Sequence, residues 1–307
     1  MMAYLIRRLL LTVFVLWGVG SLVFAVLRLA PGDPAALQLG ITATHEQIAE
    51  FRHRTGLDRP IGLQYVTFLA DASRLDFGDS TVSDAKASTL VLQRLPYTIG
   101  LAISAMALAL ILSFPLGMLA ARSAGGPLDR GVSFLSISGQ ALPSFWVGVM
   151  LILVFSRDLK LFPSGGTGTL LHLVLPAVTL AAPLASVLTR LIRSGLIGVA
   201  DEGYLQTARA KGMSERDVLI HHALPNVMIP VVTVAGLQFG HLLGGAVVVE
   251  VVFAWPGIGQ LLVDSIANRD YGVVQACTFL IATIFLVVNL MVDLSYHYLD
   301  PRASALG

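Results

Sequence analysis

Six long apolar stretches constrain the fold of this chain more than any other feature of its sequence. A helix needs roughly 20 mostly apolar residues to cross the hydrocarbon core of a bilayer, where it satisfies its own backbone hydrogen bonds. The stretches that meet this length are residues 9–27, 95–121, 131–156, 170–189, 227–249 and 271–292. The sequence therefore predicts an all-α, polytopic membrane protein with six transmembrane helices.

The composition agrees with a chain whose solvent is lipid. Hydrophobic residues make up 55% of the sequence and charged residues 13%, which is outside the usual range of a water-soluble domain. The formal net charge is only +1, so there is no electrostatic case for a nucleic-acid partner. The single cysteine, Cys277, lies in an apolar run, and we expect it to be a small packed hydrophobe.

Basic residues predict which side of the membrane each connection faces, because cytoplasmic loops retain Lys and Arg. With the N-terminus inside, the inner segments hold ten basic residues, whereas the short outer loops hold only Arg157, Lys160 and Arg269. The sequence therefore predicts that both termini are cytoplasmic. The first span lacks a clear small-residue cleavage pattern, so we expect it to stay attached.

The spans and their connections divide the chain into four predicted parts. Residues 1–30 form an N-terminal transmembrane helix, 31–93 an extracytoplasmic cap, 94–296 a core that contains the other five spans, and 297–307 a short cytoplasmic tail. In the cap, Thr44 with Gln47 has the pattern of a capping box, and Gly56 is placed to end that helix. A second helix is predicted from the spacing of Ile61, Tyr65, Phe68, Leu69 and Ala72. We expect either a structural cap or a docking or lid surface.

The inner connection at about 198–226 is long for a link between neighbouring spans. Asp201 and Glu202 begin a run that is acidic at its start and basic at its end, as the helix dipole prefers, and Gly212 can close it in the left-handed conformation. Ser214 then caps a second helix, which is predicted to stop at Pro225. The pattern predicts a helix, a glycine turn and a helix at the cytoplasmic face, which either dock a partner or have a purely structural role.

Catalytic motifs are missing from the sequence. It has no G-x-x-x-x-G-K-[ST] loop for nucleotide phosphates, no H-E-x-x-H metal motif and no G-x-S-x-G elbow. We therefore expect no catalytic residue, no metal site and no cofactor in this chain. Buried carboxylate chains, which ion-coupled transporters use, are not visible either. Energy for any transport must come from elsewhere.

A few polar residues interrupt the apolar spans. Burying a polar side chain in lipid costs free energy, so residues of this kind often have a function. Gln238 and His241 are three residues apart in the fifth span and share a helix face. They either line a pathway or form interhelical hydrogen bonds. Gly236, Gly240 and Gly244 form a small-residue stripe for close helix packing on another face. Asn289 and Asp293 interrupt the sixth span, and structural pairing is the better interpretation for Asp293.

The inner loop reads Tyr204-Leu-Gln-Thr-Ala-Arg-Ala-Lys-Gly212 and is followed by His222-Ala-Leu-Pro225. It resembles the EAA loop of ABC importer permeases, in the form found in the dipeptide, oligopeptide and nickel branch. Gln206-Thr207-Ala208 replaces the general Glu-Ala-Ala start, which fits this branch. Motifs along the whole chain resemble the first of the two paired permeases: Pro31-Gly-Asp-Pro34, Gly56-Leu-Asp58, Phe77-Gly78 with Ser80, Pro143-Ser-Phe-Trp146, Trp255-Pro-Gly-Ile-Gly259, Arg269-Asp-Tyr271 and Asp300-Pro-Arg302.

The resemblance implies a type I ABC importer (MetI-like) permease fold in a bacterial or archaeal plasma membrane. It also implies partners, namely a second homologous permease, two cytoplasmic ATPase domains that hold ATP and Mg, and an extracytoplasmic solute-binding protein. Coupling to the ATPases is implied for Tyr204, Thr207, Ala208, Arg209, Ala210, Lys211 and Gly212. We further expect Gln238 and His241 in the pathway, and Glu250, Trp255, Pro256 and Gly257 at an outer docking site or gate.

Peptides are the expected solutes, and several alternatives stay open at this point. Nickel or another small solute is handled by similar permeases. An ion-coupled or passive transporter would carry solute without an ATPase partner. A membrane enzyme would need Ser144 and a buried histidine for hydrolysis, and a receptor or assembly factor would show no nucleotide-driven flux.

Overall fold

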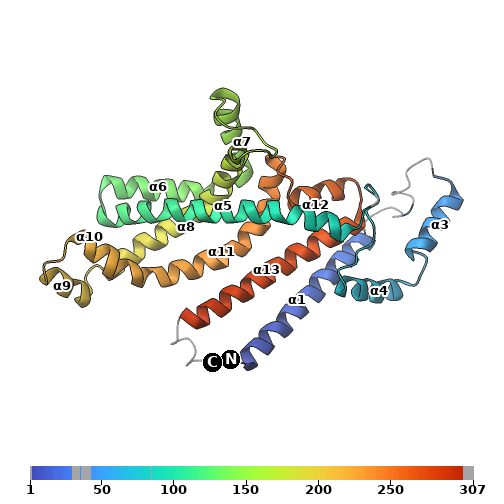
Figure 1. Ribbon diagram of the computed structural model, residues 1–307, viewed down its shortest axis with the longest axis horizontal. Coiled ribbons are helices and arrows are strands. Elements are labelled where there is room, and N and C mark those ends of the chain that lie inside the picture. The colour runs from blue at the N-terminus through green and yellow to red at the C-terminus, as the bar shows by residue number, and fades with distance from the viewer. Residues whose placement is uncertain (1, 30–34, 36–42, 84, 300–307) are drawn as a thin grey trace. The chain divides into compact units, whose positions relative to one another are not determined.

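The computed structural model describes residues 2–29, 35, 43–83 and 85–299 of the chain. Over these residues the chain is almost entirely helical, as the sequence predicts (Figure 1). Its helices belong to two compact units, Met1–Thr98 with Pro256–Leu286 (unit 1) and Ile99–Trp255 with Val287–Gly307 (unit 2). Two long helices, α5 (Ala87–Arg122) and α13 (Tyr271–Leu299), contribute residues to both units.

Unit 1 contains the first span and the predicted cap. Its other helices are α1 (Met2–Leu29), α3 (His45–Thr55), α4 (Ile61–Ser73) and α12 (Ile258–Ala267). A small core joins the start of α5 to α12 and α13, and its buried members are Ala87, Val91, Ile258, Val273, Ala276 and Cys277. Cys277 is fully buried there, which confirms the prediction that it is a packed hydrophobe.

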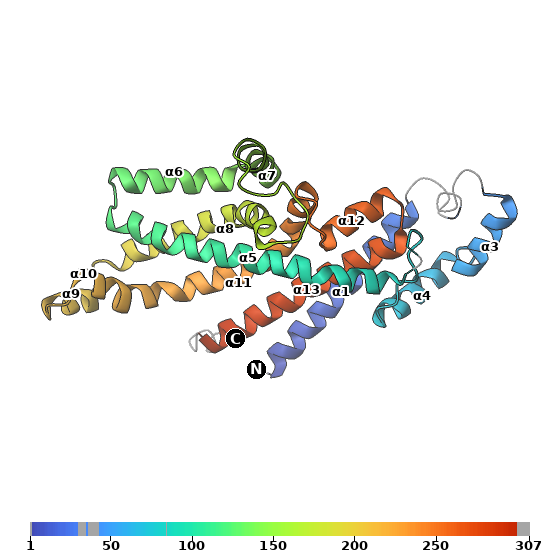
Figure 2. The same ribbon diagram turned by 45° about the horizontal axis from the view of Figure 1, so that its top comes forward.

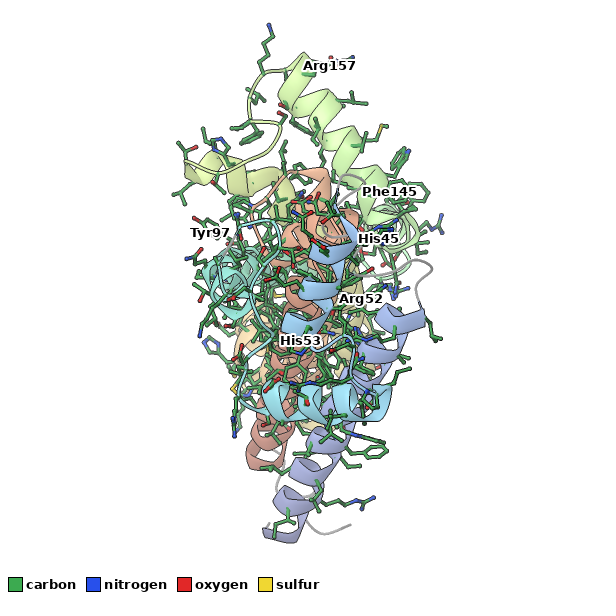
Figure 3. All side chains as sticks on the ribbon, turned by 90° about the vertical axis from the view of Figure 1, so that its right-hand side faces the viewer. His45, Arg52, His53, Tyr97, Phe145 and Arg157 are labelled. Carbon is green, nitrogen blue, oxygen red and sulfur yellow. The ribbon has the colours of Figure 1, made fainter. Side chains whose placement is uncertain are left out.

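The cap helices form where their local signals place them. Thr44 and Gln47 make both hydrogen bonds of the capping box at the start of α3, which carries His45, Arg52 and His53 (Figure 3). Gly56 ends α3 with a φ of 69°, in the left-handed region. The second predicted helix is α4. Residues 30–34 and 36–42 lie outside the described residues, and with them the Pro31–Pro34 motif.

Unit 2 is built around one central helix. Its helices are α6 (Pro127–Ala141), α7 (Ser144–Leu151), the π-helix η1 (Ile152–Asp158), α8 (Leu170–Val199), α9 (Gly203–Ala210), α10 (Glu215–Asp217), the π-helix η2 (Val218–Ala223) and α11 (Leu224–Val252). Helices α6, α7 and α11 all pack on α8 (Figure 2). Helix α8 carries a row of buried side chains four residues apart, Leu184, Leu188, Ile192 and Leu196. This spacing places the row on one helix face.

Small residues allow close approach at the crossings of these helices. A Cβ added to Gly139 of α6 would overlap the Ser186 hydroxyl of α8. At Gly195 of α8 a Cβ would lie 2.6 Å from a methyl carbon of Val227 on α11. Glycine at such points lets helix backbones pack more tightly than any side chain would permit.

Five of the six predicted spans are continuous helices, long and apolar enough to cross a membrane. These are Ile6–Leu29, Ala87–Arg122, Leu170–Val199, Glu215–Val252 and Tyr271–Val292. Four of the five extend beyond the predicted bounds, at one end or at both, because the helix continues past the uncharged apolar stretch. The tail predicted at 297–307 lies mostly outside the described residues.

The third predicted span, 131–156, is not one straight helix. Helix α6 and the α7–η1 helix meet at a bend of 107° between Ala141 and Ser144. The cause is local, because a residue that precedes proline is pushed out of the helical region, and Leu142 before Pro143 has a ψ of 133°. Phe145 and Arg157 mark opposite ends of the second arm (Figure 3).

Candidate functional site

The inner connection forms a compact elbow of two helices, which we call the elbow and define as residues 200–226. Its first helix, α9, begins after Glu202, and its inward side is apolar. Leu205 and Ala208 are 1% and 6% exposed and face η2, where Val218 is also buried. Burial of these side chains holds α9 against the N-terminal end of the long helix that leads into α11.

Gly212 makes the turn of the elbow, as predicted. Its φ is +82°, a conformation that costs little for glycine and is strained for residues with a Cβ. Gly212 N donates to Arg209 O at 2.9 Å, which closes the end of α9. Ser214 then caps the next helix, its Oγ accepting from Asp217 N at 3.2 Å. The predicted helix, glycine turn and helix are therefore confirmed.

Side-chain hydrogen bonds lock the two arms of the elbow together. Asn226 Nδ2 donates to Tyr204 Oη at 3.1 Å and to His222 O at 2.9 Å. Arg209 Nε donates to Glu215 Oε1 at 2.9 Å, and its Nη1 donates to Ala200 O at 3.0 Å. Because both arms are tied, the elbow has the geometry to move as one rigid piece.

The second arm does not stop at Pro225, contrary to prediction. Residues Glu215–Val252 form one helix with a π-helical stretch, η2, just before Pro225. Proline lacks an N–H and clashes with the carbonyl four residues earlier in an α-helix. The wider π-turn ends at Ala223, so that Pro225 stands in the first turn of α11, where its missing N–H costs little. The elbow is consequently continuous with the fifth span.

The predicted coupling residues differ in their exposure to solvent and in their contacts within the elbow. Five of them are exposed to solvent, namely Tyr204, Thr207, Ala210, Lys211 and Gly212. Ala208 is buried inside the elbow, and Arg209 is engaged with Glu215 and Ala200. Ala208 and Arg209 thus stabilise the elbow itself, although the Arg209 side chain is also exposed to solvent.

The two polar residues of the fifth span lie on α11. Gln238 is partly buried and His241 is exposed, and their spacing of three residues gives them neighbouring positions on the helix. Of the polar residues of the sixth span, Asn289 is partly buried, and the side chain of Asp293 lies outside the described part of the structure.

The end of α11 is a tightly packed turn. Glu250 is completely buried and Trp255 is 7% exposed, and Trp255 N donates to Glu250 O at 2.8 Å. A loop reaches this turn from the second arm of the bent span, since Gly166 N donates to Phe253 O at 2.8 Å. A Cβ on Gly165 would overlap that carbonyl oxygen. Sequence reasoning missed Gly165, although two adjacent glycines in a short loop are a signal of close backbone approach.

The residues after this turn begin unit 1. Pro256 is partly buried and Gly257 is buried, and Gly257 is the N-cap of α12 in an extended conformation. Thr98 Oγ1 accepts a hydrogen bond from Ile258 N at 2.9 Å at the start of this helix. A backbone N–H group at the start of α12 is thus satisfied by the side chain of a threonine in α5.

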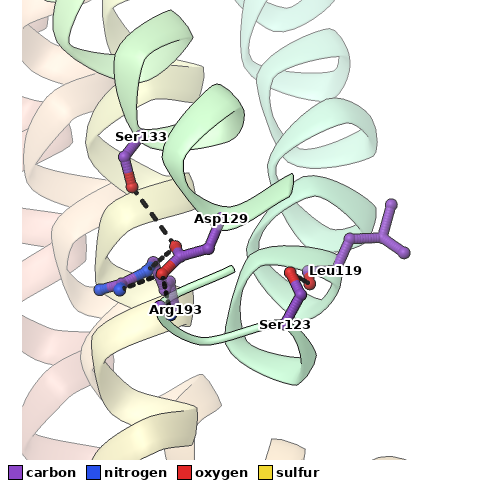
Figure 4. Close-up of polar contacts among 6 residues, drawn as sticks. Leu119, Ser123, Asp129, Ser133 and Arg193 are labelled. Carbon is purple, nitrogen blue, oxygen red and sulfur yellow. Dashed lines mark hydrogen bonds and ion pairs between the residues drawn. The ribbon is translucent and has the colours of Figure 1, made fainter. Parts of the chain in front are cut away.

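An ion pair that sequence reasoning missed ties α6 to α8. The Arg193 guanidinium donates through Nε to Asp129 Oδ1 and through Nη2 to Oδ2, the latter at 2.7 Å (Figure 4). Gly125 N donates to Asp129 Oδ2 at 2.8 Å, and Ser133 Oγ lies 3.4 Å from Oδ1. Asp129 is 3% exposed. An acid and an arginine at the ends of apolar helices were the available signal, because buried charges are paired.

Comparison with known proteins gives a consistent result along the whole chain. Residues 113–305 match the family described as "Binding-protein-dependent transport system inner membrane component", and residues 1–102 match the N-terminal part described for the membrane components of these systems. Among solved structures, an inward-facing MetNI methionine ABC transporter chain has a TM-score of 0.59 at 18% identity, covering 69% of this chain and 96% of that chain. This likeness shows the type I (MetI-like) permease fold.

Three relatives match nearly end to end. A probable peptide ABC transporter permease protein, y4tP of Sinorhizobium fredii, is 40% identical over 97% of this chain and 98% of the relative. The oligopeptide transport system permease protein AppB of Bacillus subtilis is 40% identical over 98% and 99%. The glutathione transport system permease protein GsiC of Escherichia coli K12 is 42% identical over 98% of both chains. The chain belongs to the family of inner-membrane permease components of binding-protein-dependent ABC transport systems.

Proposed function

We propose that this chain is one permease subunit of an ATP-driven importer whose solutes are peptides. The observation that carries the proposal is the similarity of 40–42% identity, along almost the whole chain, to permeases named for a peptide, an oligopeptide and glutathione. The alternatives of nickel, another small solute or ion coupling gain no support from these relatives.

The family supports a set of partners for the complete importer. A second homologous permease completes the pathway, two cytoplasmic ATPase domains bind ATP and Mg and hydrolyse the nucleotide, and an extracytoplasmic binding protein delivers the solute. This chain contributes no catalytic residue of its own. The proposed location is the plasma membrane of a bacterium or archaeon, with both termini in the cytoplasm, as the distribution of basic residues favours.

The elbow is the proposed coupling element. Its exposed residues Tyr204, Thr207, Ala210 and Lys211 dock in a partner ATPase, while Ala208 and Arg209 keep the elbow rigid. Because the second arm continues into α11 without a break, a displacement of the elbow is passed directly to the fifth span. Movement of the ATPases thereby opens the pathway to alternate sides of the membrane, which is a population shift between two states.

The fifth span also supplies the proposed pathway and gate. Gln238 and His241 on α11 contribute polar groups to the pathway, and both lie on the helix that the elbow moves. The turn at its far end, with Glu250 and Trp255 followed by Pro256 and Gly257, acts as an outer gate or docking site. Glu250 and Trp255 are buried, so in this chain they support the gate from inside.

Reconstitution tests the proposed function directly. The chain is purified with its partner permease and ATPases, placed in proteoliposomes that contain ATP, and supplied with binding protein and radiolabelled di- to tetrapeptides outside. We expect peptide uptake that requires ATP and every subunit, and none with a non-hydrolysable ATP analogue. Uptake by vesicles that contain only this chain, or ATP-driven uptake of nickel complexes in place of peptides, would contradict the proposal.

A further inference from the structure

A cleft of about 860 Å³ lies within unit 1 and has no part in the coupling mechanism proposed above. Its walls are the C-terminal end of α1, helices α3 and α4, the loop after α4, and the start of α13. Clefts that hold small organic molecules commonly measure about 300–1,000 Å³. The cleft is therefore large enough for a ligand of several residues or for a lipid headgroup.

Arg28, at the end of α1, is a fixed cation on one wall of this cleft. Its Nε and Nη2 donate to Gln64 Oε1 at 3.0 and 2.8 Å. Its guanidinium also lies 4.9 Å from the centre of the Phe24 ring, at a distance typical of a cation–π contact. These contacts hold the guanidinium in one position.

The residues behind Arg28 are themselves fixed. The Gln64 amide nitrogen donates to Leu57 O at 3.1 Å and to Arg59 O at 2.8 Å, so its carbonyl oxygen must face Arg28. Phe24 is buried and packs against the rings of Tyr65 and Phe68, with centroids 5.4 and 5.5 Å away. A cation supported in this way is preorganised, which lowers the cost of binding a ligand.

The charge of Arg28 is not neutralised by a carboxylate among the residues that the structure describes. Arginine has five N–H donors, and within the described part of the chain the hydrogen bonds of Arg28 engage two of them, both with one neutral amide oxygen. A partly buried cation normally has an anionic partner. The position is thus suited to an oxyanion that comes from outside the described residues.

Carboxylates line the same cleft at other points. Asp71 is in the last turn of α4, and Asp76 and Asp79 are in the loop that follows. Asp76 Oδ1 accepts from Gly78 N at 3.2 Å, which orients that loop. A cleft that presents a fixed guanidinium and several carboxylates offers partners for both charges of a zwitterion.

We propose that this cleft binds an organic zwitterion, with its oxyanion on Arg28 and its ammonium group near Asp71, Asp76 and Asp79. Two sources supply this chemistry, a short free peptide and the headgroup of phosphatidylethanolamine. In the proposed orientation the cleft opens on the outer side of the membrane, where it can meet either. The inference stands apart from the proposed function, because it concerns binding to unit 1 and requires no flux.

Binding of a dipeptide to the unaltered protein is the first test. The complete permease and ATPase complex is placed in nanodiscs of phosphatidylglycerol, whose headgroup has no ammonium group, without binding protein, and titrated with radiolabelled alanyl-alanine in equilibrium dialysis. Alanyl-alanine amide lacks the carboxylate, and N-acetyl-alanyl-alanine lacks the ammonium group. We expect each to compete at least about tenfold less well than the dipeptide, as loss of one charged contact implies.

Variants then assign the binding to the cleft. Arg28→Gln removes the charge, and we expect at least about tenfold weaker binding, with a smaller loss in Asp71→Asn. Arg74→Gln is the matched control, since Arg74 is exposed beside α4 and is not part of the cleft wall. If Arg28→Gln does not fold, the analogue competition on the unaltered protein still decides between a zwitterion site and none.

A lipid arm distinguishes the two sources. The complex is extracted from membranes that contain phosphatidylethanolamine and examined by native mass spectrometry. Retention of this lipid by the unaltered chain and its loss in Arg28→Gln, with no dipeptide binding, supports the headgroup as ligand. The proposal is wrong if neither ligand binds, if the two analogues that lack one charge compete as well as the dipeptide, or if Arg28→Gln and Arg74→Gln bind alike.

Discussion

The Ser80 hydroxyl donates a 2.5 Å hydrogen bond to Oδ2 of Asp270, although the two residues are 190 positions apart in the sequence. Both residues are at least 96% buried. The same hydroxyl accepts from the backbone N–H groups of Val82 and Ser83, each at 3.2 Å. This contact joins the loop after the cap helices to the start of α13 within unit 1.

We expect Ser80→Ala to destabilise the protein by about 1–3 kcal/mol, because the buried Asp270 carboxylate then loses its hydroxyl donor and keeps only the long bond from Val273 N among the contacts described. Ser83→Ala, which removes an exposed hydroxyl in the same loop, is the control and should have little effect. Thermal unfolding of the purified complex in detergent measures both. Ser80→Ala should lower the free energy of unfolding less in the Asp270→Asn background than in the unaltered protein. If the two effects add strictly, the two side chains do not interact.

The Arg193–Asp129 pair predicts a second effect on stability. Asp129→Asn leaves the guanidinium of α8 without its partner, and Arg193→Gln leaves a buried carboxylate, so each variant should lower the melting temperature. The double variant should lose less than the sum of the two. Arg130→Gln, at an exposed neighbouring position, controls for loss of a positive charge. Equal melting temperatures for Arg130→Gln and Arg193→Gln would show that the ion pair does not stabilise the packing of α6 on α8.

Packing of the elbow gives a third prediction. Leu205 is 1% exposed, and truncation of a buried leucine to alanine costs about 2–5 kcal/mol. We expect Leu205→Ala to loosen α9, so that backbone amides of residues 203–210 exchange with deuterium markedly faster. Lys211→Ala, at an exposed position, should leave their exchange unchanged. Unaltered exchange in Leu205→Ala would mean that α9 is held by the side-chain hydrogen bonds alone.

The turn at Gly212 predicts a loss of coupling. A β-branched residue at a φ of +82° is strained by about 1–3 kcal/mol. In Gly212→Val we expect peptide uptake to fall while ATP hydrolysis no longer responds to the binding protein, both measured in the same proteoliposomes. Gly212→Asn should retain more activity because asparagine tolerates the left-handed region.

A matched glycine variant in the adjoining span controls this experiment. Gly198 lies in α8, and a Cβ there would meet no atom within 4 Å. Gly198→Val should therefore couple normally. If Gly212→Val also transported and hydrolysed normally, the turn would have no part in coupling.

Two glycines of α11 form a matched pair for helix packing. A Cβ on Gly236 would lie 2.9 Å from methyl carbons of Val292, whereas a Cβ on Gly244 would meet nothing within 4 Å. Because valine is stiff at χ1, Gly236→Ala should destabilise by about 1–3 kcal/mol, the usual range for overpacking. Gly244→Ala should be neutral or slightly stabilising. Equal unfolding temperatures would show that Val292 moves aside at little cost.

Local signals explain why so much of the helical structure was predictable. The capping box of Thr44 and Gln47, the left-handed Gly56 and Gly212, and the Ser214 cap each depend on residues within a few positions of one another. Such signals act before any tertiary contact forms. Pro225 was misread for the same reason, since the rule that proline ends a helix ignores a preceding π-turn.

The sequence by itself determined that this chain crosses a lipid bilayer, roughly where its spans lie, and which short segment forms the elbow, because hydrophobic length and helix caps depend on neighbouring residues. The tertiary structure decided which polar groups meet. Ser80 finds Asp270, and Asp129 finds Arg193, across 190 and 64 positions. Such partners depend on how helices pack, and no local pattern specifies a pairing between residues so far apart in the chain.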